Sequence, residues 1–405
     1  MKSKQLLYKS EMLRHFYFGG ILSCAELSIL TQKSLPLTTK VLNELLEEGA
    51  IVETGLALST GGRRPQTYAL ANELMYTVAV AMDQHITRIA IMDMQNNYVQ
   101  EVDEYELTLA GNPLALQHLG NHITTTISRS RVPRDKIAGI GIGMPGFIDF
   151  NRGINHSFLK PPAGHTVVSF LSDHTRLPVF IDNDSSLIAL AEAQFGVAKG
   201  HKNVMVINVS WGVGLGMILN GKLYRGDSGF AGEFSHIPVF TNEKICSCGK
   251  IGCLETEASL VVMVAKALEG IAAGRSTRLK ALEPEHLHQA ADQIMQAAAH
   301  GDMFAIELLS EIGYNIGRGI AILVHILNPG HIVLSGRGAA AGNLWLAPIQ
   351  QAINENCIPK IAENTSIAVS NMGLRAELIG AASLVMEHLD TVDIPIHLKD
   401  LDKVA

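Results

Sequence analysis

Cysteine, charge and long apolar runs are all scarce in this chain of 405 residues, and each scarcity excludes a class of protein. Five cysteines are too few for the disulfide framework of a secreted protein. The low charged fraction of 18%, beside 47% apolar residues, excludes a disordered or fibrous chain. No apolar run approaches the ~20 residues of a membrane-spanning helix, and the first residues lack a signal-peptide pattern. We therefore expect a soluble, cytoplasmic protein without membrane insertion.

The pattern of residues changes near residue 72, which predicts two kinds of domain. Residues 1–71 read as short helices followed by a hairpin. Beyond them, short apolar strands at 76–81, 137–142, 204–209 and 332–336 alternate with helices, which is typical of α/β domains. We expect a first α/β lobe at 72–190, completed by a C-terminal helix at 376–390. A second lobe is expected at 191–375, with a ligand cleft between the lobes.

The N-terminal segment has the pattern of a winged helix-turn-helix. Ser23 and Glu26 form a capping box that opens one short helix, and Ser34 with Pro36 opens a second helix ending near Gly49. On that second helix, five apolar residues cover one face: Leu37, Val41, Leu42, Leu45 and Leu46. The opposite face carries Thr39, Lys40 and Asn43. A small protein-interaction module is the alternative interpretation of this segment.

Charge favours DNA as the partner of this segment. Residues 1–70 carry a net charge of +2, whereas the rest of the chain carries −9 and should repel polyanions. The tip of the expected wing holds Arg63 and Arg64 beside two glycines, and arginine at such a tip can enter a minor groove. We therefore predict DNA contacts from Thr39, Lys40, Asn43, Arg63 and Arg64.

Three of the five cysteines lie within eight positions and follow a histidine by ten residues. One imidazole and three thiolates form the donor set of a closed tetrahedral zinc site, which leaves no position for a catalytic water. We therefore predict structural Zn²⁺ bound by His236, Cys246, Cys248 and Cys253. A loop with incidental reduced thiols is the alternative.

Carboxylates flank this loop. Glu233 and Glu255 bracket the metal segment, and clustered carboxylates suit an array of sugar hydroxyls. Asn183 and Asp184 follow an apolar strand, where ligand sites of parallel α/β sheets usually lie. Asp184 equally fits the role of an N-cap for the helix that follows, and the sequence alone leaves these two interpretations even.

These motifs together resemble the ROK family, which joins sugar-responsive repressors and sugar kinases. The resemblance rests on the segments 181–184, 232–236, 246–255 and 328–336, and on Gly61-Gly62-Arg63-Arg64-Pro65 in the wing. It implies an actin-like, hexokinase-like (ribonuclease H-like) pair of lobes behind the winged helix-turn-helix. It also implies sugar contacts from Asn183, Asp184, Glu233, His236 and Glu255, with His236 serving both sugar and zinc.

The sequence departs from the kinases of this family at both expected phosphate loops. Their Asp-x-Gly-Gly-Thr loop corresponds to Asp83-Gln84-His85-Ile86-Thr87, which has no glycine to let a phosphate approach the backbone. Their Gly-Thr-Gly-x-Gly loop corresponds to residues 210–214, where Trp211 replaces the threonine. Asp184, the catalytic base of a kinase, is therefore expected to be vestigial as a base and to contact the ligand instead.

The resemblance and these departures predict a repressor of carbohydrate-use genes and not an enzyme. A sugar or sugar phosphate is the expected effector, and a palindromic operator is the expected DNA partner of a homodimer or homotetramer. A sugar kinase with an appended DNA-binding domain is the alternative. Some members of the family bind a phosphoprotein of a sugar-transport system, and that partner stays open for this chain.

Overall fold

The computed structural model describes residues 4–57, 64–279, 282–283 and 286–392, and it divides the chain into two compact units. The first unit comprises residues 1–184 and 378–405, and the second comprises residues 185–377. Among the described helices, none is both long and apolar enough to cross a membrane.

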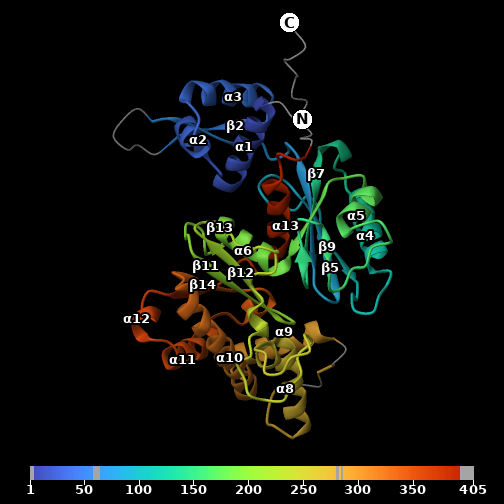
Figure 1. The fold of residues 1–405 in the computed structure, drawn as a ribbon, viewed down its shortest axis with the longest axis vertical. Helices are drawn as coiled ribbons and strands as arrows, with labels where there is room; N and C mark the ends of the chain where they lie inside the picture. Colours follow the sequence, from blue (N-terminus) through green and yellow to red (C-terminus); the bar gives the residue numbers. More distant parts are fainter. Residues whose placement is uncertain (1–3, 58–63, 280–281, 284–285, 393–405) are drawn as a thin grey trace. The chain divides into compact units, whose positions relative to one another are not determined.

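The N-terminal part of the first unit is a winged helix-turn-helix (Figure 1). Its three helices are α1 (Lys4–Gly19), α2 (Cys24–Thr31) and α3 (Leu35–Glu47). Its sheet has the order β1–β3–β2, built from β1 (Leu22–Ser23), β2 (Ile51–Leu56) and β3 (Gln66–Leu70). The capping box predicted at the start of α2 is present in full, because Ser23 and Glu26 bond to each other's backbone amides.

Two local expectations for α3 need correction. Ser34 occupies the N-cap position, but its side chain makes no capping hydrogen bond. Leu37 does not belong to the buried face, since 44% of it is exposed. The buried residues of α3 are Thr38, Val41, Leu42 and Leu45.

The remainder of the first unit is a five-stranded sheet with helices on both faces. Its strand order is β10–β7–β4–β5–β6, with β10, β7 and β4 parallel. Figure 1 shows α4 and α5 on one face and α13 on the other. Gly141 allows α13 to pack closely, because a Cβ there would lie 1.9 Å from the carbonyl oxygen of Ala381. The elements are β4 (Tyr76–Met82), β5 (Ile86–Met92), β6 (Asp103–Glu106), α4 (Ala115–Arg129), β7 (Ile137–Met144), β8 (Ile148–Asp149), β9 (Ile154–Asn155), α5 (Val167–Thr175), β10 (Val179–Asn183) and α13 (Arg375–Glu387).

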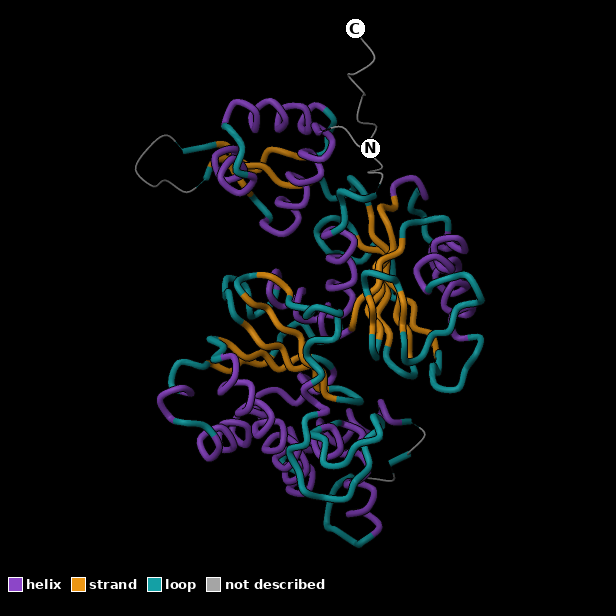
Figure 2. The backbone as a smooth tube through the Cα atoms, viewed as in Figure 1, coloured by secondary structure: helices purple, strands orange, loops and turns teal. Residues whose placement is uncertain are grey.

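The second unit repeats this arrangement with a sheet of order β13–β12–β11–β14–β15. Helix α6 packs against β12, where a Cβ on Gly216 would lie 2.3 Å from the carbonyl oxygen of Ser185. The other helices gather on one side of the sheet (Figure 2) and enclose one large apolar core. The elements are α6 (Asp184–Phe195), β11 (Val204–Val209), β12 (Val213–Leu219), β13 (Lys222–Leu223), α7 (Glu255–Ala258), α8 (Leu260–Ala272), α9 (Leu287–Ala299), α10 (Met303–Leu327), β14 (His331–Ser335), α11 (Leu346–Asn356), α12 (Pro359–Ala362) and β15 (Ser366–Val369).

Candidate metal and ligand site

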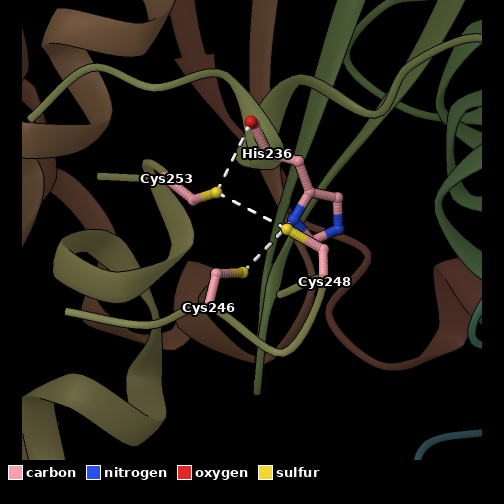
Figure 3. Close-up of side chains that lie close together, drawn as sticks. All are labelled: His236, Cys246, Cys248 and Cys253. Carbon is pink, nitrogen blue, oxygen red and sulfur yellow. Dashed lines mark hydrogen bonds between the residues drawn. The ribbon is translucent and has the colours of Figure 1, made fainter. Parts of the chain in front are cut away.

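The four predicted metal ligands converge in the second unit (Figure 3). One ligand atom from each of His236, Cys246, Cys248 and Cys253 lies within 4.8 Å of the others. The Cys248 and Cys253 sulfurs are 3.7 Å apart, and the Cys246 sulfur is 3.5 Å from Nδ1 of His236. A tetrahedral ion with Zn–S bonds of ~2.3 Å places its ligand atoms roughly 3.5–3.8 Å apart. The cluster therefore has the dimensions and donor set of a Cys₃His metal site.

Backbone turns bring these ligands together. His236 ends the short 3₁₀ turn Phe234–His236, which follows Gly232. Gly232 has a φ of +102°, and a Cβ there would lie 2.4 Å from the carbonyl oxygen of Leu215. Gly252 has a φ of +75°, and a Cβ there would lie 2.1 Å from the carbonyl oxygen of Phe240. Both positions therefore require glycine, for conformation and for space.

The chemistry of the thiols also fits a cation. Burial, with the neighbouring thiols, raises the pKa of Cys253 to about 12. Without a cation this sulfur keeps its proton at neutral pH, and a metal ion must displace that proton to bind. Cys246 and Cys253 are buried, whereas Cys248 is exposed.

Two carboxylates lie beside the metal cluster. Glu233 faces the ring nitrogen of His236 that points away from the thiols, and Oε1 of Glu255 is 3.9 Å from the Cys246 sulfur. Oε2 of Glu233 is 3.6 Å from Nε2 of His236, so one ring nitrogen faces the thiols and the other faces a carboxylate. Glu255 accepts hydrogen bonds of 3.4 Å from the hydroxyls of Ser235 and Ser247. Burial raises the pKa of Glu233 above its usual value; His236 opposes the shift and Glu255 adds to it. This geometry joins Glu233, His236 and Glu255 into one polar cluster.

Asn183 and Asp184 lie in the first unit. Asn183 is the last residue of β10, and its side-chain amide donates to the carbonyl oxygen of Gly146 at 3.3 Å. Asp184 is the first residue of α6, one position beyond the N-cap that one of its two sequence-based interpretations assigned to it. These two residues adjoin each other and belong to a different unit from the Glu233 cluster.

The turn that begins at Asp83 is held by hydrogen bonds between the Asp83 side chain and backbone amides of the same turn. Oδ1 of Asp83 accepts hydrogen bonds from the backbone amides of His85 at 2.7 Å and Ile86 at 2.8 Å. Backbone amides of this kind are the groups that cradle a phosphate in a phosphate loop. Here a side chain of the same turn already uses them.

Trp211 is buried in the second unit and held from two sides. The Arg337 guanidinium carbon is 5.5 Å from the centre of the Trp211 ring, and the His288 ring meets it edge-on at 4.5 Å. Nη1 of Arg337 is in turn 3.1 and 3.2 Å from the two carboxylate oxygens of Asp292. Trp211 is recognisable in the sequence from its place in the expected phosphate loop. Arg337, His288 and Asp292 come from distant segments, and no motif marks them.

A pocket of about 530 Å³ opens beside Arg337 in the second unit. No motif in the sequence indicates this pocket. Its lining combines polar groups with small and apolar side chains: Asp292, Met295, Gln296, Ala299, His300, Gly336, Arg337, Ala339, Ala340, Ser370, Asn371, Gly373 and Leu374.

The predicted DNA contacts on α3 are all accessible. Thr39, Lys40 and Asn43 are exposed. Arg64 is exposed as well, and its guanidinium donates to the carbonyl oxygens of Ala57 at 2.6 Å and Leu56 at 3.1 Å. Arg63 lies outside the described residues.

The model of the ROK family matches residues 77–388. The chain belongs to the ROK family. The match covers both α/β bodies and excludes the winged helix-turn-helix. ROK membership, expected from the sequence motifs, is therefore confirmed.

Two relatives represent the two branches of the ROK family. The xylose repressor of Bacillus spizizenii is 28% identical, over 96% of this chain and 97% of its own length. The glucokinase of Halalkalibacterium halodurans is 32% identical, over 72% of this chain and 90% of its own length. The repressor thus aligns with nearly the whole chain, and the glucokinase leaves more than a quarter of it unmatched.

A ROK protein also provides a full-length structural match. The crystal structure of a ROK family transcriptional regulator, a homologue of the Escherichia coli Mlc protein, superposes with a TM-score of 0.77. It covers 95% of this chain and 96% of its own, at 24% identity. The expected fold, a winged helix-turn-helix followed by a two-lobed actin-like body, is confirmed.

Proposed function

We propose that this ROK protein is a sugar-responsive transcriptional repressor of carbohydrate-use genes that has lost kinase activity. The observation that carries the proposal is the full-length match to repressors, which includes the winged helix-turn-helix outside the ROK family model. We also propose the functional division expected from the sequence: DNA binding at 1–71, one lobe at 72–190 with 376–390, and a second lobe at 191–375.

The DNA-binding role is assigned to the exposed polar face of α3 and to the wing. Thr39, Lys40 and Asn43 would meet base edges or phosphates in a major groove, and Arg63 and Arg64 would contact an adjacent groove or backbone. The exposure of the first three and of Arg64 supports this assignment. A homodimer or homotetramer would place two such domains on the half-sites of a palindromic operator.

The effector role is assigned to the polar residues predicted from the motifs. Asn183, Asp184, Glu233, His236 and Glu255 would accept hydrogen bonds from, or donate them to, the hydroxyls of a sugar or sugar phosphate. Zn²⁺ held by His236, Cys246, Cys248 and Cys253 would fix the imidazole, so that Nε2 faces the ligand side. Four protein ligands leave no open coordination position, so this metal would be structural.

Loss of kinase activity is supported at two separate points of the chain. The amides of the Asp83 turn are satisfied by its own carboxylate, and Trp211 fills the other turn under Arg337. Movement of a loop can offset one such change, whereas two independent changes remove both expected phosphate contacts. Asp184 would then act as a ligand contact and not as a base.

The proposed regulation is thermodynamic linkage. A sugar that binds one conformation of the body more tightly raises the population of that conformation. If that conformation holds the DNA-binding domains in a spacing unsuited to the operator, the sugar lowers the affinity for DNA. DNA then lowers the affinity for the sugar by the same coupling free energy.

The test begins with DNA selected from a random pool by the full-length protein. Free and phosphorylated hexoses, amino sugars and pentoses, xylose included, are then screened for release of that DNA. The same panel is assayed for ADP release from ATP. We expect selective DNA binding, release by one class of sugar and no ADP release. Turnover at ~1–100 per second would instead establish the kinase suggested by the glucokinase relative. Capture of a transport-system phosphoprotein, without any sugar effect, would identify the third kind of partner.

A further inference from the structure

Helix α1 of the DNA-binding domain makes polar contacts at both of its ends, and these contacts serve different partners. Its first half holds α3. Nζ of Lys9 is 3.1 Å from Glu44 and 2.7 Å from Glu48, and only 5% of the Lys9 side chain is exposed. The hydroxyl of Tyr8 is 2.8 Å from that of Thr38, on the buried face of α3. The orientation of α3 is thus fixed to that of α1.

The other end of α1 is bonded to the α/β body of the first unit. Tyr17 is 4% exposed, and its hydroxyl donates to Oδ1 of Asn96 at 2.5 Å. Burial raises the pKa of Tyr17 far above its usual value, so the phenol keeps the proton that it donates. This hydrogen bond spans 79 positions of the chain and joins two buried side chains.

Asn96 is held by a rigid turn that follows β5. It has a φ of +60°, a left-handed conformation that asparagine tolerates better than most residues. The carboxylate of Asp93 accepts from the amides of Gln95 at 2.8 Å and Asn97 at 2.9 Å, which closes the turn around Asn96. The acceptor of the Tyr17 proton is therefore a fixed point of the α/β body.

The chain leaving the DNA-binding domain is fastened at the same turn. The amide of Met94 donates to the carbonyl oxygen of Asn72 at 3.2 Å. Outside this turn, Nζ of Lys136, just before β7, donates to the carbonyl oxygen of Glu73 at 3.2 Å. Residues 72–73 directly follow the last strand of the winged domain. Two connections, one through α1 and one through this linker, thus meet the turn at 93–97.

We propose that Tyr17 is a positioning residue whose hydroxyl, bonded to Asn96, fixes α1, and with it α3, to the α/β body. A single covalent linker would allow the domain to rotate about residues 71–73, whereas a second point of attachment removes that freedom. The consequence for DNA binding rests on the proposed function, in which α3 binds DNA. The attachment of α1 to the α/β body does not depend on that function.

The first experiment needs neither DNA nor sugar. Tyr17→Phe keeps the buried ring and removes only the hydroxyl. Asn96→Gly keeps the left-handed backbone and removes the acceptor together with the rest of the side chain. Amide hydrogen exchange is measured by mass spectrometry on peptides covering 71–75 and 93–97. We expect exchange at least tenfold faster in either variant, with peptides of α1 and α3 unchanged, and no further increase in the double variant. Tyr105→Phe, which removes a hydroxyl bonded to Thr126, is the matched control and should match the wild type.

The second experiment measures affinity for the DNA selected by the wild type. Loss of the attachment should weaken binding about tenfold in Tyr17→Phe and Asn96→Gly, although the residues on α3 are intact. Wild-type exchange rates in Tyr17→Phe, or effects that add in the double variant, would overturn the inference. Absence of selective DNA binding in the wild type would instead defeat the proposed function, and the exchange result would still decide the attachment.

Discussion

At the scale of single residues, Cys248 gives the sharpest test of the metal site. It is the exposed member of the cluster, so Cys248→Ser removes a ligand without opening a cavity in the core. We expect one zinc per wild-type chain and its loss in Cys248→Ser, together with a lower thermal unfolding midpoint, because metal binding stabilises only the folded state.

Elemental analysis of protein purified without added metal measures this stoichiometry. Cys24→Ser, which changes a cysteine outside the cluster, should retain one equivalent. A wild-type chain that is stable and free of metal would contradict the prediction.

His331 predicts how the stability of the second unit depends on pH. Its ring stacks on that of His201 at 4.4 Å, its Nδ1 is 2.7 Å from the hydroxyl of Ser366, and burial, aided by His201, lowers its pKa. The His331 ring is therefore protonated at a lower pH in the folded state than in the unfolded chain, where its pKa is ~6.5. The stabilising contribution is present above that pH and is lost as the pH falls through the lowered pKa of the folded state.

Thermal unfolding at pH 7.5 and 5.5 tests the role of His331. The midpoint should fall less on acidification in His331→Gln than in the wild type. His286→Gln is the control, because His286 is largely exposed and paired with Glu283 on the surface. Equal pH dependence in His331→Gln and the wild type would contradict the prediction.

At the scale of elements, substitutions on α3 and in the wing should distinguish residues that set sequence specificity from residues that contribute affinity for any DNA. Asn43→Ala should cost about 1–3 kcal/mol of binding free energy for the selected DNA if the side chain contacts a base. Lys40→Ala, if it loses a phosphate contact, should weaken binding to all DNA sequences. It should also lower the slope of log binding constant against log salt concentration by about one in magnitude. The measurement is fluorescence anisotropy at several salt concentrations.

Lys360→Ala is the matched control for the loss of one positive charge, since Lys360 is exposed on α12 in the second unit. It should bind DNA like the wild type. The double variant Arg63→Ala/Arg64→Ala tests the wing separately, and unchanged affinity there would exclude the wing as a DNA-binding element.

At the scale of the whole molecule, effector binding and DNA binding should be separable by mutation. Asp184→Asn keeps the size of the side chain but removes its charge, so it should weaken sugar binding at least tenfold. Calorimetry measures that affinity, and anisotropy measures DNA binding without sugar, which should match the wild type. Loss of DNA binding in Asp184→Asn without sugar would show that this residue supports the fold and not the ligand.

The sequence by itself determined what depends on neighbouring residues and on recurring motifs. The capping box of α2 uses side chains three positions apart, and the runs that form β4, β7, β11 and β14 are apolar because both faces of each strand are buried. The metal ligands were recognisable because three of the four lie in one short loop. ROK membership followed from the order of the motifs.

Only the tertiary structure decided which distant segments meet. Helical periodicity placed Leu37 on the apolar face of α3, but periodicity does not show where the packing neighbours of a helix end, and Leu37 is exposed. The support of Trp211 by Arg337, the pocket beside it, and the bond from Tyr17 to Asn96 all join segments far apart in the chain. Such contacts depend on how the strands are ordered and how the helices pack, which no local pattern of residues specifies.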